Sequence, residues 1–154
     1  MMPLVPTSVR RAPGTAPAWE GVMEEDTPNG RHVLLVEDED SLNRVLARLL
    51  GDEGYAVAAH RCPVEALRAM DERPGGWDLL VTDLRLPSMS GLELIAAARA
   101  RQPDLAVLII SATLPPEGEG ELLAPREFLH KPFTATHFFG RIAELLSGRP
   151  VRLG

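Results

Sequence analysis

Apolar runs of strand length alternate with segments of helical periodicity along most of this 154-residue chain. The strands are predicted over His32–Val36, Tyr55–His60, Asp78–Thr82, Leu105–Ile110 and Arg126–His130. An uninterrupted apolar run such as Leu105–Ile110 is typical of a strand that helices cover on both faces. Because strands and helices alternate, right-handed crossovers into one parallel sheet are expected. The pattern therefore predicts an α/β fold.

The helices are predicted over Ser41–Glu53, from Cys62 to the break at Pro74-Gly75-Gly76, over Gly91–Arg101 and over Thr134–Leu146. Pro63 in the first turn and Glu65, three residues after Cys62, indicate where the second helix starts. Thr134 is expected to cap the last helix. The side chains predicted to face the core are Leu42, Val45, Leu46, Leu49, Leu50, Val64, Leu67, Met70, Leu92, Leu94, Ile95, Ala98, Phe138, Ile142, Leu145 and Leu146.

Two stretches lack this regularity. Residues 1–30 are rich in proline and glycine without any period, which predicts a disordered tail or linker. Residues 113–125 contain three prolines and two glycines, so at most one or two helical turns fit there. The expected organisation is a tail or linker over 1–30, one domain over 31–147 and a short tail over 148–154.

Charge and composition exclude several classes of protein. The net charge is −6 and no run of basic residues occurs, so neither nucleic acid nor a membrane surface is an expected partner. The single cysteine, Cys62, excludes an internal disulfide and is compatible with a reducing cytosol. No apolar run approaches the roughly 18 residues of a membrane span. A cytoplasmic location is expected.

Polar side chains follow four of the five predicted strands. Glu37 and Asp38 follow the first strand, Asp83 the third, Ser111 the fourth and Lys131 the fifth. The carboxyl ends of parallel strands share one sheet edge, where open α/β sheets bind ligands. Carboxylates about 4 Å apart repel by roughly 1 to 4 kcal/mol at a surface-like dielectric, and Mg²⁺ would relieve that repulsion. Together with the Ser111 hydroxyl and Lys131, these acids predict a phosphate-binding site. The alternative is that the acids after the first strand form only a solvated charged run.

Four motifs in this set resemble those of response regulator receiver domains, the phosphoacceptor modules of two-component signalling. They lie at 33–39 (VLLVEDE), 80–87 (LVTDLRLP, followed by Ser90-Gly91), 110–112 (ISA) and 128–133 (FLHKPF), in the family's order. The resemblance covers about residues 31–147. It implies a flavodoxin-like, doubly wound sheet of five parallel strands in the order 2-1-3-4-5. About five helices are then expected, the fourth of them short or irregular.

The resemblance also implies the chemistry of the acidic residues. Asp83 would be the phosphoacceptor, attacking a phosphohistidine of a histidine kinase or a histidine phosphotransfer protein. Glu37, Asp38, Asp83 and the backbone carbonyl of Arg85 would hold Mg²⁺. Such a domain catalyses its own phosphorylation and dephosphorylation and is not otherwise an enzyme. Its downstream target is a protein that the sequence does not identify.

Three further residues would bind the phosphoryl group and report it. Lys131 matches the lysine that pairs with the acceptor or its phosphoryl group, and Pro132 after it is a candidate for a cis peptide bond. Ser111 matches the switch hydroxyl, and Phe128 matches the aromatic side chain whose rotamer follows that hydroxyl.

Two other classes stay open. A pseudo-receiver would keep the fold and bind partners without phosphorylation, which the irregular stretch before the fifth strand favours. A phosphohydrolase of the haloacid-dehalogenase type would use Asp38 and Asp40 after the first strand, but that reading leaves Asp83 unexplained. The chain is expected to be either a standalone receiver or a fragment of a hybrid kinase.

Overall fold

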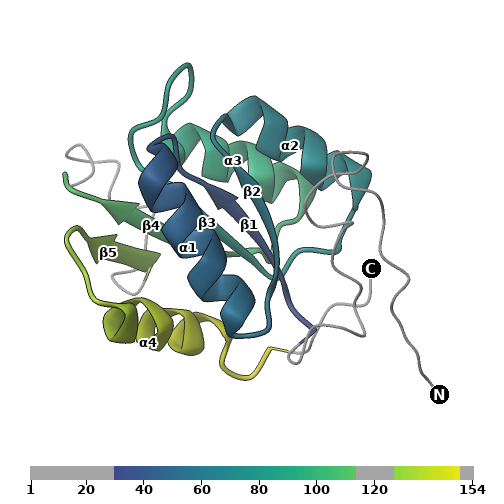
Figure 1. Cartoon of the computed structure of the whole chain (residues 1–154). Coiled ribbons are helices and arrows are strands. Elements are labelled where there is room, and N and C mark those ends of the chain that lie inside the picture. Colours follow the sequence, from purple (N-terminus) through teal and green to yellow (C-terminus); the bar gives the residue numbers. More distant parts are fainter. Residues whose placement is uncertain (1–29, 114–126, 150–154) are drawn as a thin grey trace, which may run out of the picture.

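The computed structural model describes residues 30–113 and 127–149. They contain a five-stranded parallel sheet in the order β2-β1-β3-β4-β5 (Figure 1). The strands are β1 (His32–Val36), β2 (Ala56–His60), β3 (Leu79–Asp83), β4 (Ala106–Ser111) and β5 (Phe128–His130). The predicted α/β fold and strand order are confirmed, with each strand end within two residues of its prediction.

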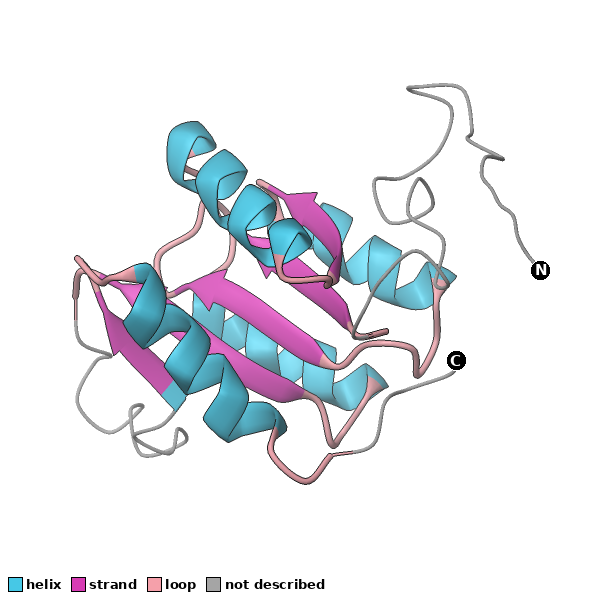
Figure 2. Ribbon diagram, turned by 60° about the horizontal axis from the view of Figure 1, so that its bottom comes forward, coloured by secondary structure: helices cyan, strands magenta, loops and turns pink. Residues whose placement is uncertain are grey.

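Four helices cover the two faces of this sheet in the described part of the chain. They are α1 (Asp40–Asp52), α2 (Pro63–Glu72), α3 (Gly91–Arg101) and α4 (Ala135–Leu146). Figure 2 shows the strands between two helical layers, with α1 and α4 on one face and α2 and α3 on the other. The fourth helix that was predicted as short or irregular falls in 114–125, outside the described residues.

The alternation of side chains along the strands divides the core into two layers. In β1, Val33 and Leu35 belong to the layer under α1 and α4, whereas Leu34 and Val36 belong to the layer under α2 and α3. All five β1 residues are buried, as expected for a central strand covered on both sides. Trp77 and Phe138 are the largest fully buried side chains, one in each layer.

The prediction that Val45 and Val64 face the core is wrong. Val45 of α1 is 53% exposed and Val64 of α2 is 47% exposed. The buried positions of α1 are Asn43, Leu46 and Leu50, which share one helical face and leave Val45 beside it. In α2 the buried residues are Pro63, Ala66, Ala69 and Met70, which leaves Val64 on the solvent side.

The helix starts were predicted with mixed success. Thr134 caps α4, and its side chain accepts the His137 N–H at 3.1 Å, as predicted. Pro63 occupies the first turn of α2, but Cys62 at the cap makes no side-chain hydrogen bond, so the expected capping box is absent there. A complete capping box occurs at α3 instead, where Ser90 and Glu93 bind each other's backbone N–H groups.

Candidate functional site

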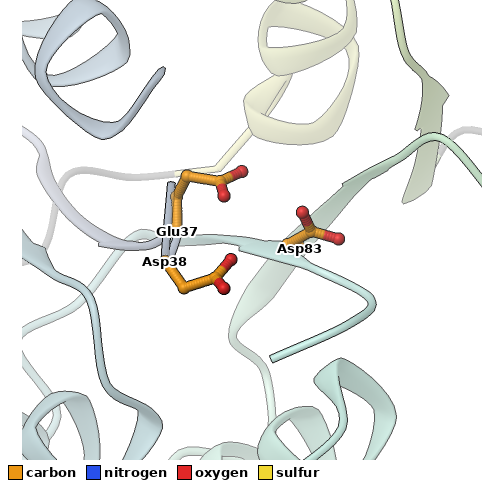
Figure 3. A group of neighbouring side chains, drawn as sticks. All are labelled: Glu37, Asp38 and Asp83. Atoms are coloured by element: carbon orange, nitrogen blue, oxygen red, sulfur yellow. The ribbon is translucent and has the colours of Figure 1, made fainter. Parts of the chain in front are cut away.

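Three carboxylates converge at the carboxyl end of the sheet. Glu37 and Asp38 follow β1, Asp83 ends β3, and one ligand oxygen from each lies within 4.8 Å of the others (Figure 3). The parallel β1–β3 pairing causes this approach, because Val36 lies opposite Thr82 and the next residues, Glu37 and Asp83, therefore lie side by side. Glu37 and Asp83 are buried, while Asp38 is more open to solvent. The predicted acidic cluster is therefore present.

Lys131 supplies the cation of this cluster. Its Nζ donates to Asp83 Oδ2 at 2.8 Å and to Glu37 Oε1 at 3.1 Å. Its backbone N–H donates to the Ser111 carbonyl at 2.8 Å, which aligns the lysine with the end of β4. The Lys131–Pro132 peptide bond is cis, the isomer considered from the sequence. The lysine thus bridges carboxylates from β1 and β3 although it follows the edge strand β5.

Burial and hydrogen bonding have opposite effects on the pKa values of Glu37 and Lys131. Burial raises the pKa of Glu37 above its ordinary value, and the hydrogen bonds from Glu39 and Lys131 only partly offset that rise. For Lys131 burial acts to lower the pKa, but the hydrogen bonds to Asp83 and Glu37 outweigh it and the net shift is upward. The lysine is therefore held in its charged form beside Asp83 at neutral pH.

Backbone and side-chain donors fix the carboxylates in place. Glu37 Oε2 accepts the Glu39 N–H at 3.0 Å, and Asp83 Oδ1 accepts the Arg85 N–H at 3.0 Å. Asn43 Nδ2 donates to the carbonyl of Glu37 at 2.9 Å and to that of His60 at 3.0 Å, joining the ends of β1 and β2. Asn43 was not predicted as a site residue, although an asparagine on the apolar face of a helix was a signal for it.

Gly91 brings the start of α3 back against the backbone of Asp83 and Leu84. Its N–H donates to the Leu84 carbonyl at 2.7 Å. A Cβ at this position would lie 2.9 Å from the Leu84 Cα and would overlap the Asp83 carbonyl oxygen. Only glycine fits this approach, so Gly91 positions Asp83 through the backbone. The sequence motif contained this glycine but gave no reason for it.

The two predicted switch residues lie on β4 and β5. Ser111 ends β4 and is 1% exposed. Its Oγ accepts the Thr113 N–H at 3.2 Å and lies 3.3 Å from Thr113 Oγ1. Phe128 begins β5 and is partly buried against the core layer under α2 and α3. Among the described residues, the side-chain contacts of Ser111 Oγ are therefore with Thr113 and not with Asp83.

Carboxylate oxygens at this spacing suit a hard divalent cation. Mg²⁺ is bound in proteins by one or two carboxylates with substrate oxygens and water, and it prefers oxygen ligands. Glu37, Asp38 and Asp83 supply such oxygens, and the Lys131 ammonium forms ion pairs with two of the three, Glu37 and Asp83. A surplus of negative charge remains for a cation to neutralise. The residues present therefore fit a magnesium site.

Comparison with known proteins identifies the family. The family model described as "Response regulator receiver domain" matches residues 33–143. The chain therefore belongs to the response regulator receiver domain family of two-component systems. It is similar to the response regulator receiver protein CpdR of Brucella abortus, with 31% identity over 122 residues that cover 75% of this chain and 97% of CpdR.

Longer relatives and solved structures agree with this assignment. The uncharacterized transcriptional regulatory protein YkoG of Bacillus subtilis is 33% identical over 117 residues, covering 75% of this chain and 50% of that protein. This chain thus spans about half the length of YkoG. The non-phosphorylated receiver domain of HemR from Leptospira biflexa has a TM-score of 0.69 and 32% identity, covering 78% of this chain and 98% of that domain. Among the described helices, none is long and apolar enough to cross a membrane.

Proposed function

We propose that Asp83 accepts a phosphoryl group from the phosphohistidine of a histidine kinase or a histidine phosphotransfer protein in a Mg²⁺-dependent reaction. The observation that carries the proposal is the environment of the Asp83 carboxylate. One oxygen binds the Arg85 N–H, and the other binds the Lys131 ammonium beside two further carboxylates. Stabilisation at both oxygens suits a nucleophile that becomes an acyl phosphate.

The transfer forms one bond and breaks one bond. A carboxylate oxygen of Asp83 attacks the phosphorus, the P–N bond to the donor histidine breaks, and the imidazole leaves with the electron pair and takes up a proton. Lys131, charged at neutral pH, stabilises the negative charge on the phosphoryl oxygens in the transition state. Water later hydrolyses the acyl phosphate and restores the carboxylate.

Glu37, Asp38, Asp83 and the backbone carbonyl of Arg85 are the proposed ligands of Mg²⁺. The ion, when bound, neutralises charge on the phosphoryl oxygens and so lowers the barrier to attack by a carboxylate. Two observations support this set of ligands: Glu37 and Asp38 directly follow β1, and the Asn43 side chain donates to the Glu37 carbonyl and so holds the turn that follows. Glu37 carries its carboxylate one methylene further from the backbone than an aspartate would.

Ser111 and Phe128 are the proposed switch. An acyl phosphate adds charge and acceptor oxygens at Asp83, and the Ser111 hydroxyl would move towards them. Phe128 would then turn into the space left behind, and the surface around β5 and α4 would change. A protein that distinguishes the two surfaces would receive the signal. We also propose a cytoplasmic location, where the kinase domains that supply phosphohistidine reside.

Mass spectrometry of the intact protein tests the reaction. The chain is incubated with acetyl phosphate or phosphoramidate, with and without Mg²⁺, and weighed. The expected result is a gain of one phosphoryl group that requires Mg²⁺ and is removed by hydroxylamine. Asp83→Asn should abolish the gain, and the control Asp40→Asn, at the acid that begins α1 just after Glu37 and Asp38, should retain it.

Other outcomes would point to the other classes. A pseudo-receiver would give no adduct with any donor, including a cognate kinase. A hydrolase would be labelled at Asp38 and would turn over small phosphate esters. The presence of the lysine bridge to Asp83 favours phosphorylation at Asp83 over both.

A further inference from the structure

The side chains of two residues, Arg85 and Thr113, connect the loops on either side of the proposed site. Arg85 lies two residues after Asp83, and Thr113 lies two residues after Ser111. The Arg85 Nε donates to Thr113 Oγ1 at 3.1 Å. The loop after β3 and the residues after β4 are thereby joined by a side-chain hydrogen bond on the solvent side of the acceptor.

The direction of this bond has a consequence for Ser111. An arginine Nε–H has no lone pair to offer, so Thr113 Oγ1 must be the acceptor. The hydroxyl proton of Thr113 is then available for Ser111 Oγ, 3.3 Å away. The Thr113 N–H donates to the same Ser111 Oγ at 3.2 Å. Thr113 thus holds the Ser111 hydroxyl through two contacts, and Arg85 orients one of them.

We propose that Arg85 and Thr113 form a latch that holds the Ser111 hydroxyl in its position before phosphorylation. The proposal rests on the proposed function of Asp83 and deepens it. A phosphoryl group on Asp83 offers charged oxygens, which a guanidinium binds more strongly than a neutral hydroxyl. The arrival of the phosphoryl group would draw Arg85 from Thr113, loosen Thr113 and release Ser111 towards the phosphoryl group. The event that is signalled would therefore also open the latch.

The geometry favours this exchange of partners. The Arg85 N–H already binds Asp83 Oδ1, so the base of its side chain stays beside the acceptor whether or not the latch is closed. The Arg85 side chain is exposed and can rotate without disturbing the core. Ser111, by contrast, is buried, so its hydroxyl loses its present partners only when it gains others.

Thr113→Val is the sharpest test because it replaces a hydroxyl with a methyl group of similar shape. Beryllofluoride, a mimic of the acyl phosphate, is titrated with Mg²⁺ into the full chain. Since the latch stabilises only the unphosphorylated state, its removal should tighten beryllofluoride binding by about two- to tenfold, the range of a single hydrogen bond. Thr113→Ser keeps the hydroxyl and should bind as the unaltered chain does.

A second measurement follows the latch without any phosphoryl mimic. In nitrogen-15 NMR spectra of the free protein, Thr113→Val should shift the Arg85 Nε–H signal and the Ser111 amide signal, and Thr113→Ser should shift neither appreciably. Beryllofluoride should move the Arg85 signal of the unaltered chain in a way that shows loss of the Thr113 bond.

The outcomes separate the latch from the proposed function. If the unaltered chain binds no beryllofluoride, the proposed function is overturned and the latch has nothing to regulate. If it binds, but Thr113→Val leaves the affinity unchanged or weakens it, the latch alone is overturned. An Arg85 Nε–H signal that Thr113→Val leaves in place would also overturn the latch, because the two side chains would then not be bonded in solution.

Discussion

Asp78 and Asp83 mark opposite ends of strand β3, and both are buried, with exposed fractions of 4% and 8%. Asp78, at the amino end, accepts the His32 N–H at 2.8 Å and lies 3.7 Å from the Arg31 guanidinium. It is one carboxylate facing one cation. Asp83, at the carboxyl end, shares the single ammonium of Lys131 with Glu37 and lies beside Asp38 as well.

The residues around Asp78 connect the segments that precede strands β3 and β4. Gln102, 4% exposed, accepts the Trp77 N–H with its Oε1 at 3.2 Å and donates to the Trp77 carbonyl through its Nε2. The loops that precede β3 and β4 are closed against each other in this way. The Asp78 carboxylate and the backbone groups of Trp77 are matched to partners in the chain itself, as most buried polar groups in stable proteins are, although the indole N–H of Trp77 is buried without a hydrogen-bond partner among the described residues.

The difference between the two ends teaches where function lies in this fold. Matched buried charges stabilise the sheet, whereas unmatched charges cost stability and are available for a ligand. The carboxyl end holds three carboxylates against one lysine, so it is the end that a cation and a phosphoryl group can complete. The predictions that follow compare substitutions at the two ends, beginning with the largest effect.

Lys131→Met should cause the largest change, in the rate of phosphorylation. It removes the cation that faces the phosphoryl oxygens, and loss of one such group typically costs about 100- to 1,000-fold in rate. Phosphorylation by acetyl phosphate, followed by intact mass over time, measures it. Arg99→Met is the matched control, since Arg99 forms an ion pair with Glu127 at 2.7 Å away from the site. A comparable fall in Arg99→Met would contradict the assignment of the effect to Lys131.

Asp78→Ala should cause the largest loss of stability. It leaves the buried His32 N–H without its acceptor and removes a counter-charge of Arg31, which together should cost about 2 to 4 kcal/mol in the free energy of unfolding. Asp83→Ala relieves crowding among carboxylates, so a change within about 1 kcal/mol is expected there. Urea denaturation without Mg²⁺ measures both. Equal losses would show that the two ends do not differ in the way described.

Gly91→Ala should impair both stability and phosphorylation. The added methyl group would push against the backbone of Asp83 and Leu84, and overpacking of this kind costs about 1 to 3 kcal/mol. Gly140→Ala in α4 is the control, because a Cβ there meets no atom within 4 Å and alanine should stabilise the helix by about 0.5 to 1 kcal/mol. Thermal unfolding should show a lower midpoint for Gly91→Ala and a higher one for Gly140→Ala. The acetyl phosphate assay should show a loss of phosphorylation in Gly91→Ala only.

The sequence predicted most of the fold because its signals were local and redundant. Each strand was an apolar run, and each helix repeated apolar residues at helical spacing, so errors at single positions did not change the topology. The convergence of Glu37, Asp38, Asp83 and Lys131 followed from the rule that parallel strands share one carboxyl edge. That rule needs only the order of the strands and not their detailed packing.

The remaining features depend on packing that the sequence does not display. Val45 and Val64 were predicted as buried because they are apolar residues at helical spacing, but each lies beside the face that its helix packs against the core. The role of Gly91 required the distance between two backbone segments. Ser90 and Glu93 have the same spacing in the sequence as Cys62 and Glu65, but only the serine has a side chain that accepts the backbone N–H of the first turn. The predicted domain limits stay predictions.

Glu37→Gln should give the smallest effect, a small change in the free energy of unfolding. It tests most directly whether the carboxylates around Lys131 carry more negative charge than the lysine balances. Burial raises the pKa of Glu37, so the folded protein binds its proton more tightly than the unfolded chain does. The stability from this proton is fully present below the ordinary pKa of 4.5 and is lost as the pH rises through the folded pKa. Glutamine removes that loss, so the variant should be slightly more stable than the unaltered chain at neutral pH but not at pH 4.

Urea denaturation at both pH values, in the absence of Mg²⁺, measures this difference. Glu39→Gln is the matched control, because it removes the same charge from an exposed position two residues further along. Added Mg²⁺ should reverse the ranking at neutral pH, since the ion stabilises a chain that retains the Glu37 carboxylate more than one that lacks it. If Glu37→Gln were less stable at neutral pH without Mg²⁺, the bond to Lys131 would outweigh the burial of the carboxylate. The carboxyl end would then be as well matched as the amino end, and the contrast between Asp78 and Asp83 would lose its physical basis.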